Sequence, residues 1–153
     1  MKVLITDHDF PDLDLERGIF AEAGIEVAAA QCRSERDVIE AGGGCAALLV
    51  QYAPVTGRVL QALPDVGIVS RFGAGYDTID PDACARHGVW LGNSPDYGVG
   101  EVATHALALA LALLRHLPMY DRDVRAGRWH YLSPGRIRRA SGLTAGIVGL
   151  GRI

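Results

Sequence analysis

Residues 45–92 read CAALLVQYAPVTGRVLQALPDVGIVSRFGAGYDTIDPDACARHGVWLG, and this stretch sets the architecture of the chain. It holds three short, continuous apolar runs, at 45–50, 67–70 and 88–92. The segments between them carry helix-end signals, because Thr56 can cap a helix that ends before Pro64. Asp80-Pro81 is typical of an N-cap followed by a first-turn proline, and Gly88 closes that helix. Alternating strands and helices at this spacing predict βαβ units and a parallel sheet.

The same pattern extends towards the N-terminus, where apolar runs lie at 2–6 and 26–30. Ser34-Glu35-Arg36-Asp37 is typical of a capping box, and the helix it begins should end at the glycines of 42–44. All five runs are continuous rather than alternating, as expected for strands covered on both faces. The sequence therefore predicts an α/β fold with five parallel strands.

The pattern changes after residue 92. A turn-rich stretch, 92–100, marks a boundary, and the Ala- and Leu-rich segment 101–117 predicts a helix that is buried nearly all round. Pro118 should break this helix, and a second one should run over 119–126 to Gly127. A basic connector over 128–141 then leads to a predicted strand at 143–149, which runs into a glycine turn.

Composition excludes several classes of chemistry. The 153 residues are 49% hydrophobic and 22% charged, which is typical of a globular protein. Among the 15 basic residues the only lysine is Lys2, so Schiff-base, pyridoxal-phosphate and Walker-type sites lack their mid-chain lysine. Residues 1–97 carry a net charge of −8 and residues 98–153 one of +5, which suggests two modules.

Targeting and redox signals are also weak. The acid-containing N-terminus has no signal-peptide core, and the longest apolar run, 106–114, is too short to span a bilayer. Three widely spaced cysteines form neither a disulfide framework nor a zinc pattern, and Cys45 is expected in the core. We therefore expect a cytoplasmic protein with no membrane partner and no metal site.

The segment Gly149-Leu150-Gly151-Arg152-Ile153 contains five of the six positions of the dinucleotide fingerprint G-x-G-x-x-G. That motif needs a strand, a tight turn and a helix N-terminus that receives a pyrophosphate. A strand as apolar as 144–149 also needs neighbouring strands and cover on both faces. We therefore expect this polypeptide to be the N-terminal piece of a longer protein.

Four ordered motifs carry a family resemblance: RFGAGYDTID at 71–80, GNSPDY at 92–97, EVATHAL at 101–107 and GIVGLGRI at 146–153. Together they resemble the D-isomer-specific 2-hydroxyacid dehydrogenases, in the branch of phosphoglycerate dehydrogenases and C-terminal-binding-protein-like dehydrogenases. The resemblance implies that residues 1–97 form a flavodoxin-like substrate-binding (catalytic) domain. It implies that residues 98–153 form a linking helix and the first strand and turn of an incomplete Rossmann NAD-binding domain.

The resemblance also implies site residues. Backbone amides of Gly73, Ala74 and Gly75 would hold the substrate carboxylate, which agrees with glycine-rich amides forming an anion nest. The loop that contains Tyr52 and Ala53 would flank the same cleft. The cofactor would contact Ala74, Val102, Gly149, Gly151, Arg152 and Ile153. No catalytic residue is carried over, because the family's arginine, glutamate and histidine lie beyond the glycine motif.

The expected function is that of an NAD-dependent oxidoreductase acting on the CH–OH group of a small D-2-hydroxy acid, with NADP left open. Gln51-Tyr52 stands where relatives commonly have Arg-Ser, which argues against phosphoglycerate as the substrate. We expect a homodimer for the full-length protein and no turnover for the 153 residues alone. The alternative is a non-enzymatic, corepressor-like or peptide-binding module of the same fold.

Two other interpretations are disfavoured. Asp7 and Asp9 after the first strand are compatible with a phosphorylated receiver domain, but that fold needs an aspartate after the third strand and a lysine after the fifth. The chain has Gln51 and no such lysine, so these acids should border the strand end. The arginine-rich region 115–139 could face nucleic acid, but the chain is net acidic, so we expect no nucleic-acid partner.

Overall fold

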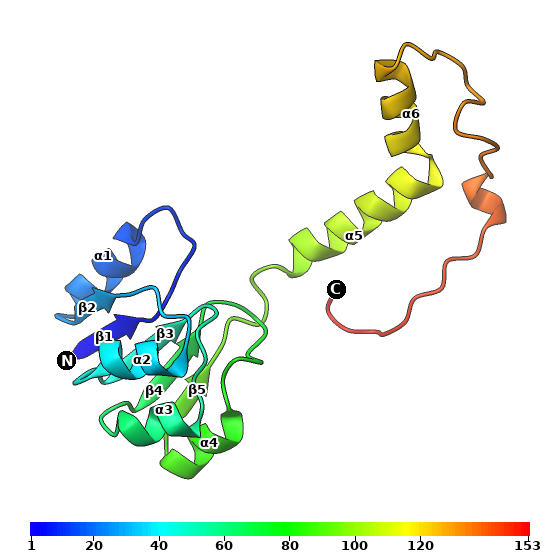
Figure 1. Cartoon of the computed structure of the whole chain (residues 1–153). Helices are drawn as coiled ribbons and strands as arrows, with labels where there is room; N and C mark the ends of the chain where they lie inside the picture. The colour runs from blue at the N-terminus through cyan, green and yellow to red at the C-terminus, as the bar shows by residue number, and fades with distance from the viewer. The chain divides into compact units, whose positions relative to one another are not determined.

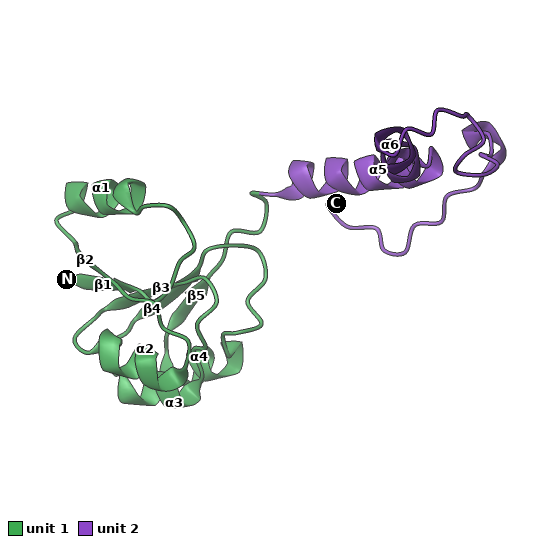
Figure 2. Cartoon of the chain, turned by 45° about the horizontal axis from the view of Figure 1, so that its top comes forward, with its two compact units in different colours: residues 1–97 green, residues 98–153 purple.

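The computed structural model describes all residues from 1 to 153 and divides into two compact units, Met1–Tyr97 and Gly98–Ile153 (Figures 1 and 2). Each unit is described by itself.

The first unit contains a five-stranded parallel sheet. Its strands are β1 (Lys2–Ile5), β2 (Glu26–Ala29), β3 (Ala47–Val50), β4 (Ile68–Arg71) and β5 (Trp90–Gly92). They are ordered β2-β1-β3-β4-β5 and every neighbouring pair is parallel. This is the flavodoxin-like order, so the predicted fold class of the first unit is confirmed.

Helices cover the two faces of this sheet unequally. The helices α2 (Glu35–Gly42), α3 (Gly57–Ala62) and α4 (Pro81–His87) lie on one face, and α1 (Asp14–Glu22) lies on the other (Figure 2). The main core lies on the three-helix face and includes Leu4, Val38, Leu48, Val59, Val69 and Ala83. On the α1 side, Ile68 and Trp90 are exposed. Within the unit, no helix therefore covers that face of β4 and β5.

The helix α1 has weak sequence signals, and none of the expected helices accounts for it. Its N-cap residue, Leu13, makes no side-chain capping bond, and none of its own residues is buried. Leu13, just before the helix, is the side chain that packs inside. The connection between the parallel strands β1 and β2 has to cross over the sheet, and α1 forms part of it. The sequence of α1, however, contains neither a capping residue nor an apolar stripe.

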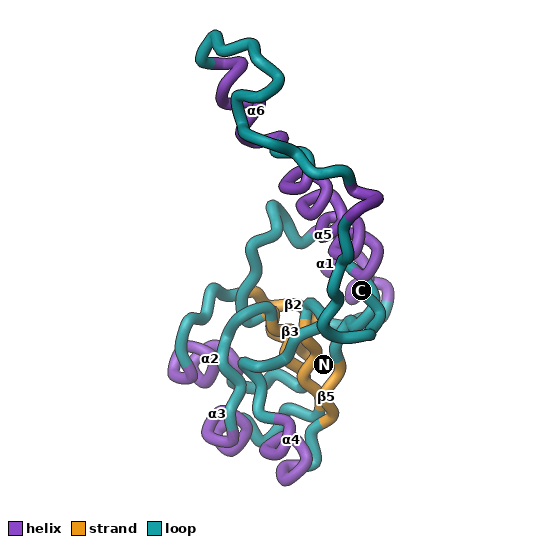
Figure 3. The backbone as a smooth tube through the Cα atoms, turned by 90° about the vertical axis from the view of Figure 1, so that its right-hand side faces the viewer, coloured by secondary structure: helices purple, strands orange, loops and turns teal.

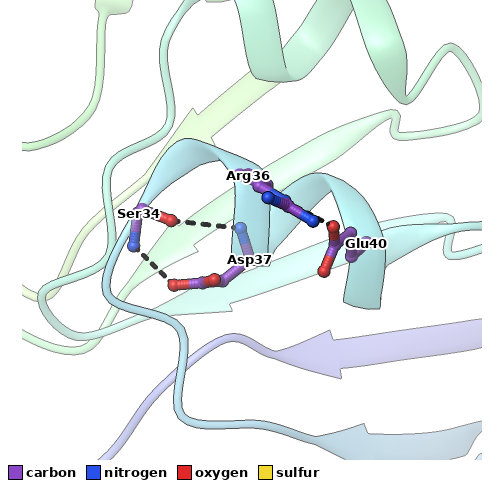
Figure 4. Close-up of polar contacts among 4 residues, drawn as sticks. All are labelled: Ser34, Arg36, Asp37 and Glu40. Atoms are coloured by element: carbon purple, nitrogen blue, oxygen red, sulfur yellow. Dashed lines mark hydrogen bonds and ion pairs between the residues drawn. The ribbon is translucent and has the colours of Figure 1, made fainter.

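The predicted helix ends of the first unit are largely confirmed. Figure 4 shows the capping box of α2, in which the Ser34 hydroxyl accepts from the amide of Asp37 and the Asp37 carboxylate accepts from the amide of Ser34. Asp80 caps α4 through the amide of Ala83, and Gly88 ends that helix with a left-handed φ of 69°. Thr56 does stand at the N-cap of α3, but its hydroxyl donates to Glu35 at 2.6 Å instead of capping.

The second unit consists of α5 (Val99–Leu114), α6 (Leu117–Arg125) and a 3-10 turn, η1 (Ala140–Gly142). Apart from η1, the chain after α6 is loop, as Figure 3 shows. The break between the helices lies at Arg115 and His116, earlier than predicted, and His116 takes a left-handed φ of 55°. Pro118 does not end α5; it occupies the first turn of α6, where its missing N–H costs nothing.

Two predictions for the second unit are wrong. The helix α5 has no buried residue, and most of its leucines, such as Leu107 and Leu113, are exposed, because within its unit it packs mainly against α6. The segment 143–149 is not a strand, and Val148 is fully exposed. A strand needs a hydrogen-bonding neighbour, and no segment of the chain pairs with these residues.

By length and composition, none of the helices taken singly could cross a membrane, whereas α5 and α6, bent by 60° at their break, pass that test only as a pair.

Candidate functional site

Loops that follow three strands meet at the carboxyl edge of the first unit's sheet. They are residues 6–10 after β1, residues 51–53 after β3, and residues 72–75 after β4. The neighbours β1 and β3 form the point at which the strand order reverses, since β2 lies on the other side of β1. In open parallel sheets, ligands bind outside the carboxyl ends of the strands at such a point.

Asp7 organises the loop after β3 from inside the protein. The residue is 5% exposed, and its carboxylate accepts from the amides of Gln51 at 3.2 Å, Tyr52 at 2.6 Å and Ala53 at 3.1 Å. The Thr6 hydroxyl donates to the same carboxylate at 2.8 Å. Asp7 is therefore a structural anchor for this loop, and the expectation that it borders the strand end is confirmed.

Asp9 sits at the surface above this anchor in a network with two side chains of the β3 loop. The Tyr52 hydroxyl donates to Asp9 Oδ2 at 2.9 Å, the Gln51 amide nitrogen donates to Asp9 Oδ1, and Gln51 Oε1 accepts from the Asp9 amide at 2.9 Å. The hydrogen bonds from Gln51 and Tyr52 lower the pKa of Asp9, and the bond to Asp9 raises the pKa of Tyr52. The carboxylate therefore stays ionised and the phenol stays protonated at neutral pH.

The loop after β4 leaves two backbone amides open. The Gly73 amide donates to the Arg71 carbonyl at 2.9 Å, with Gly73 at φ 145°, where a side chain would collide with the Arg71 guanidinium. The Gly73 carbonyl accepts from the Ser94 amide at 3.0 Å, and the Ala74 carbonyl accepts from the Asn93 side chain at 2.8 Å. The amides of Ala74 and Gly75 donate to no group of the chain. Two successive open amides suit a small anion such as a carboxylate.

A hollow of about 290 Å³ adjoins this loop. It is lined by Phe10, Gln51, Phe72, Gly73, Ser94 and Tyr97. The rings of Phe10 and Phe72 meet edge to face, 5.3 Å between centroids. A second hollow, of about 310 Å³, is lined by Asp9, Tyr52 and Arg33 among others. Members of the Asp9 network therefore line both hollows, Gln51 the first and Asp9 and Tyr52 the second.

The structure brings the predicted substrate residues to this one edge of the sheet. They differ in their exposure and in whether their backbone amides are already hydrogen-bonded. Tyr52 is exposed and bonded to Asp9, and its ring lies 5.8 Å from the Arg71 guanidinium carbon. Ala53 is 1% exposed and its amide is taken by Asp7, so it supports the loop rather than reaching a ligand. Of the loop 73–75, only Ala74 and Gly75 have amides available.

Sequence reasoning missed the contributions of Asp9, Phe10 and Tyr97 to this edge. Asp9 and Gln51 are 42 residues apart, and no local pattern predicts that they bond. The signal that could have found Phe10 is its place five residues after the end of β1, at a predicted carboxyl edge.

The predicted cofactor residues of the second unit do not form a site by themselves. Gly149 has a left-handed φ of 98°, as a tight turn requires, but no strand precedes it and no helix follows it. Val102 lies on α5 and is exposed. A pyrophosphate cradle needs the amides of a helix N-terminus. Among them, Gly149 has the conformation that the turn of a dinucleotide site requires.

No group of three or more histidine, cysteine, aspartate or glutamate residues is placed to hold a metal ion. The three cysteines are buried and free, and burial raises the pKa of each thiol, which keeps them unreactive. In the arginine-rich region, Asp123 is 3% exposed and pairs with Arg122 and Arg128. Part of the basic charge there serves to hold the connector to α6.

Known proteins match this chain over most of its length. Residues 3–147 match the family model for "D-isomer specific 2-hydroxyacid dehydrogenase, catalytic domain". D-3-phosphoglycerate dehydrogenase of Archaeoglobus fulgidus is 32% identical over 154 residues, which cover 100% of this chain and 28% of the relative. Glyoxylate/hydroxypyruvate reductase A HPR2 of Arabidopsis thaliana is 42% identical over 96 residues, 63% of this chain and 31% of the relative.

A solved structure agrees with these matches. The NAD+-bound 3-phosphoglycerate dehydrogenase of Entamoeba histolytica superposes with a TM-score of 0.64 at 28% identity, over 74% of this chain and 39% of that one. The chain thus spans less than a third of the length of the two curated relatives above. With a family match over residues 3–147 and the flavodoxin-like strand order, the chain belongs to the D-isomer specific 2-hydroxyacid dehydrogenases, through their catalytic domain.

Proposed function

We propose that this chain is the substrate-binding part of an NAD-dependent 2-hydroxyacid dehydrogenase, which interconverts a small D-2-hydroxy acid and its 2-oxo acid. Residues 1–97 would act as the substrate domain, and residues 98–153 would begin the NAD-binding domain. Family membership supports the reaction class. NAD is supported by the NAD+-bound relative from Entamoeba histolytica, and NADP remains the alternative cofactor.

The observation that carries the proposal is the pair of open amides at Ala74 and Gly75. The loop that presents them is held from outside by Ser94 and Asn93, so the amides are oriented before a ligand arrives. A carboxylate that accepts from both would be fixed in position and orientation, with its neighbouring C2 atom held at the carboxyl edge of the sheet. This pre-organisation is the chain's contribution to the reaction.

The cofactor, when bound, supplies the hydride that C2 of the 2-oxo acid receives. In this chain Ala74, Val102, Gly149, Gly151, Arg152 and Ile153 are the residues proposed to contact it, by their place in the family motifs. We assign no acid–base residue to this chain. A homodimeric full-length protein and a cytoplasmic location belong to the same proposal and rest on family resemblance.

Steady-state kinetics tests the proposal. The complete product of the reading frame is assayed for NADH oxidation with glyoxylate, pyruvate and hydroxypyruvate, and the 153-residue chain alone serves as the control. We expect turnover with at least one 2-oxo acid for the complete product and none for the control. Turnover by the 153 residues alone would contradict the proposal that they bind the substrate without catalysing the reaction. No turnover by the complete product would favour a peptide-binding module.

A further inference from the structure

The matched relatives act on different substrates by their names, one phosphorylated and one not, so family membership leaves the substrate's C3 substituent open. Resting on the proposed function, we infer that this site selects a 2-oxo acid with an apolar, uncharged C3 substituent. Asp9 is the specificity-determining residue, because its carboxylate holds a fixed negative charge against the side chain of Gln51, which lines the hollow that a second anionic group of the substrate would enter.

The first step concerns the space beside the carboxylate-binding amides. Gly73 lines the 290 Å³ hollow, so a substrate whose carboxylate binds at Ala74 and Gly75 extends its C3 substituent towards that hollow. Three of the six lining residues are aromatic, and Phe10 and Phe72 are already packed edge to face. The only side-chain polar groups in the lining are those of Gln51 and Ser94, beside the Tyr97 hydroxyl, and none is a cation. This lining suits an apolar substituent and offers a phosphate no partner.

The second step concerns the position of Asp9. Its carboxylate accepts from the side chain of Gln51, which lines the hollow, and the next residue, Phe10, lines it too. Gln51 and Tyr52 together hold both carboxylate oxygens, so the charge cannot swing away when an anion approaches. Those same hydrogen bonds lower the pKa of Asp9, which is therefore ionised at neutral pH.

The third step is the balance of charge around the loop. Asp7 is buried, and its carboxylate oxygens are engaged by the three amides it holds. Asp77 adds a second free carboxylate, with Oδ2 3.8 Å from where a Gly75 side chain would begin. Arg71 is the opposing cation, and its guanidinium is engaged by the Phe72 carbonyl and the Tyr52 ring. One substrate carboxylate is balanced by Arg71. Arg33 lines the second hollow together with Asp9, and no cation lines the 290 Å³ hollow, so a second anionic group that enters the latter has no cationic partner.

The test compares two substrates in the complete product of the reading frame: phenylpyruvate, with an apolar substituent, and 3-phosphohydroxypyruvate, with a dianionic one. We expect kcat/KM with NADH to be at least about tenfold higher for phenylpyruvate, since like charges at a binding site are strongly unfavourable. Asp9→Asn should reduce the ratio of the two kcat/KM values, phenylpyruvate over 3-phosphohydroxypyruvate, by about tenfold, chiefly through a lower KM for the phosphorylated substrate.

Asp12→Asn is the matched control, because it removes the same charge from the same loop, where Asp12 contacts only the amide of Asp14. It should leave the ratio unchanged. Phe10→Ala should lower kcat/KM for phenylpyruvate more than for pyruvate, which lacks the ring.

The inference is overturned if the wild-type protein prefers 3-phosphohydroxypyruvate, or if Asp9→Asn changes the ratio no more than Asp12→Asn does. Absence of turnover with phenylpyruvate, pyruvate and 3-phosphohydroxypyruvate alike would instead overturn the proposed function on which the inference rests. The two failures are therefore distinguishable in one set of assays.

Discussion

At the scale of single residues, two aspartates two positions apart have different tasks. Asp7 is buried and satisfies three successive amides of the β3 loop, whereas Asp9 is exposed and is held by two side chains of that loop. The first holds the backbone in place, and the second places a charge against the side chains of Gln51 and Tyr52 at the carboxyl edge of the sheet. Their separate effects on stability and on titration can be measured.

Replacing Asp7 by alanine should destabilise the first unit by roughly 3 kcal/mol, because the buried amides of Gln51 and Ala53 lose a charged acceptor and gain no other. Urea unfolding followed by circular dichroism measures this loss. Asp12→Ala, at an exposed position of the same loop, is the control and should change stability by less than about 0.5 kcal/mol. Equal effects of the two changes would show that Asp7 does not anchor the loop.

Tyr52→Phe should raise the pKa of Asp9, because the ionised carboxylate loses one of the two side-chain donors that lower it. In the wild-type chain a lowered pKa means that the network contributes to stability above the ordinary aspartate pKa. That contribution is lost as the pH falls through the lowered value. A carboxyl-carbon NMR titration measures the shift. Tyr76→Phe removes an exposed hydroxyl that is not among the groups acting on Asp9, and it should leave the Asp9 pKa as it is.

At the scale of secondary-structure elements, the capping residues at helix ends predicted the structure better than the apolar content of a segment did. The α2 and α4 caps lie where the sequence predicts them, because a cap depends on residues within one turn of each other. The burial of α5 and the strand at 143–149 were predicted wrongly from apolar content, because burial and strand pairing both require a second element. Local signals therefore predict where a helix ends better than they predict what packs against it.

Ser34→Ala should cost about 1 kcal/mol of stability, because it removes the acceptor for the Asp37 amide at the start of α2. Arg36→Ala removes an exposed ion pair with Glu40 one turn later, at 2.7 Å, and should cost no more than about 0.5 kcal/mol. Both are read from urea midpoints of the same chain. A larger loss for Arg36→Ala than for Ser34→Ala would contradict the capping account of α2.

At the scale of the whole molecule, the apolar core belongs to one unit. All members of the core cluster come from residues between Leu4 and Cys84, whereas most of the large apolar side chains of α5 are exposed. The first unit also holds the complete carboxyl edge with its two hollows. Its fold and its candidate site therefore depend on contacts within residues 1–97.

A polypeptide of residues 1–97 should accordingly fold by itself. Its urea-unfolding free energy should lie within about 1 kcal/mol of the value for the corresponding transition of the 153-residue chain, since no member of its core is removed. Circular dichroism and amide NMR dispersion measure this, with residues 98–153 alone for comparison. A disordered spectrum for residues 1–97 would show that the second unit is needed for the first to fold.

The sequence by itself determined the parallel α/β fold, the flavodoxin-like assignment, the caps of α2 and α4, and the position of a glycine-rich loop after β4. The parallel fold, the caps and the loop follow from periodicity and short-range signals between neighbouring residues, whereas the flavodoxin-like assignment follows from the family resemblance. Only the tertiary structure decided which amides remain open, because Asp7 takes those of the β3 loop and Arg71 takes that of Gly73. It also decided that Asp9 joins Gln51 and Tyr52. The bonds of Asp7 and Asp9 to the β3 loop join residues more than 40 positions apart, and folding alone brings them together.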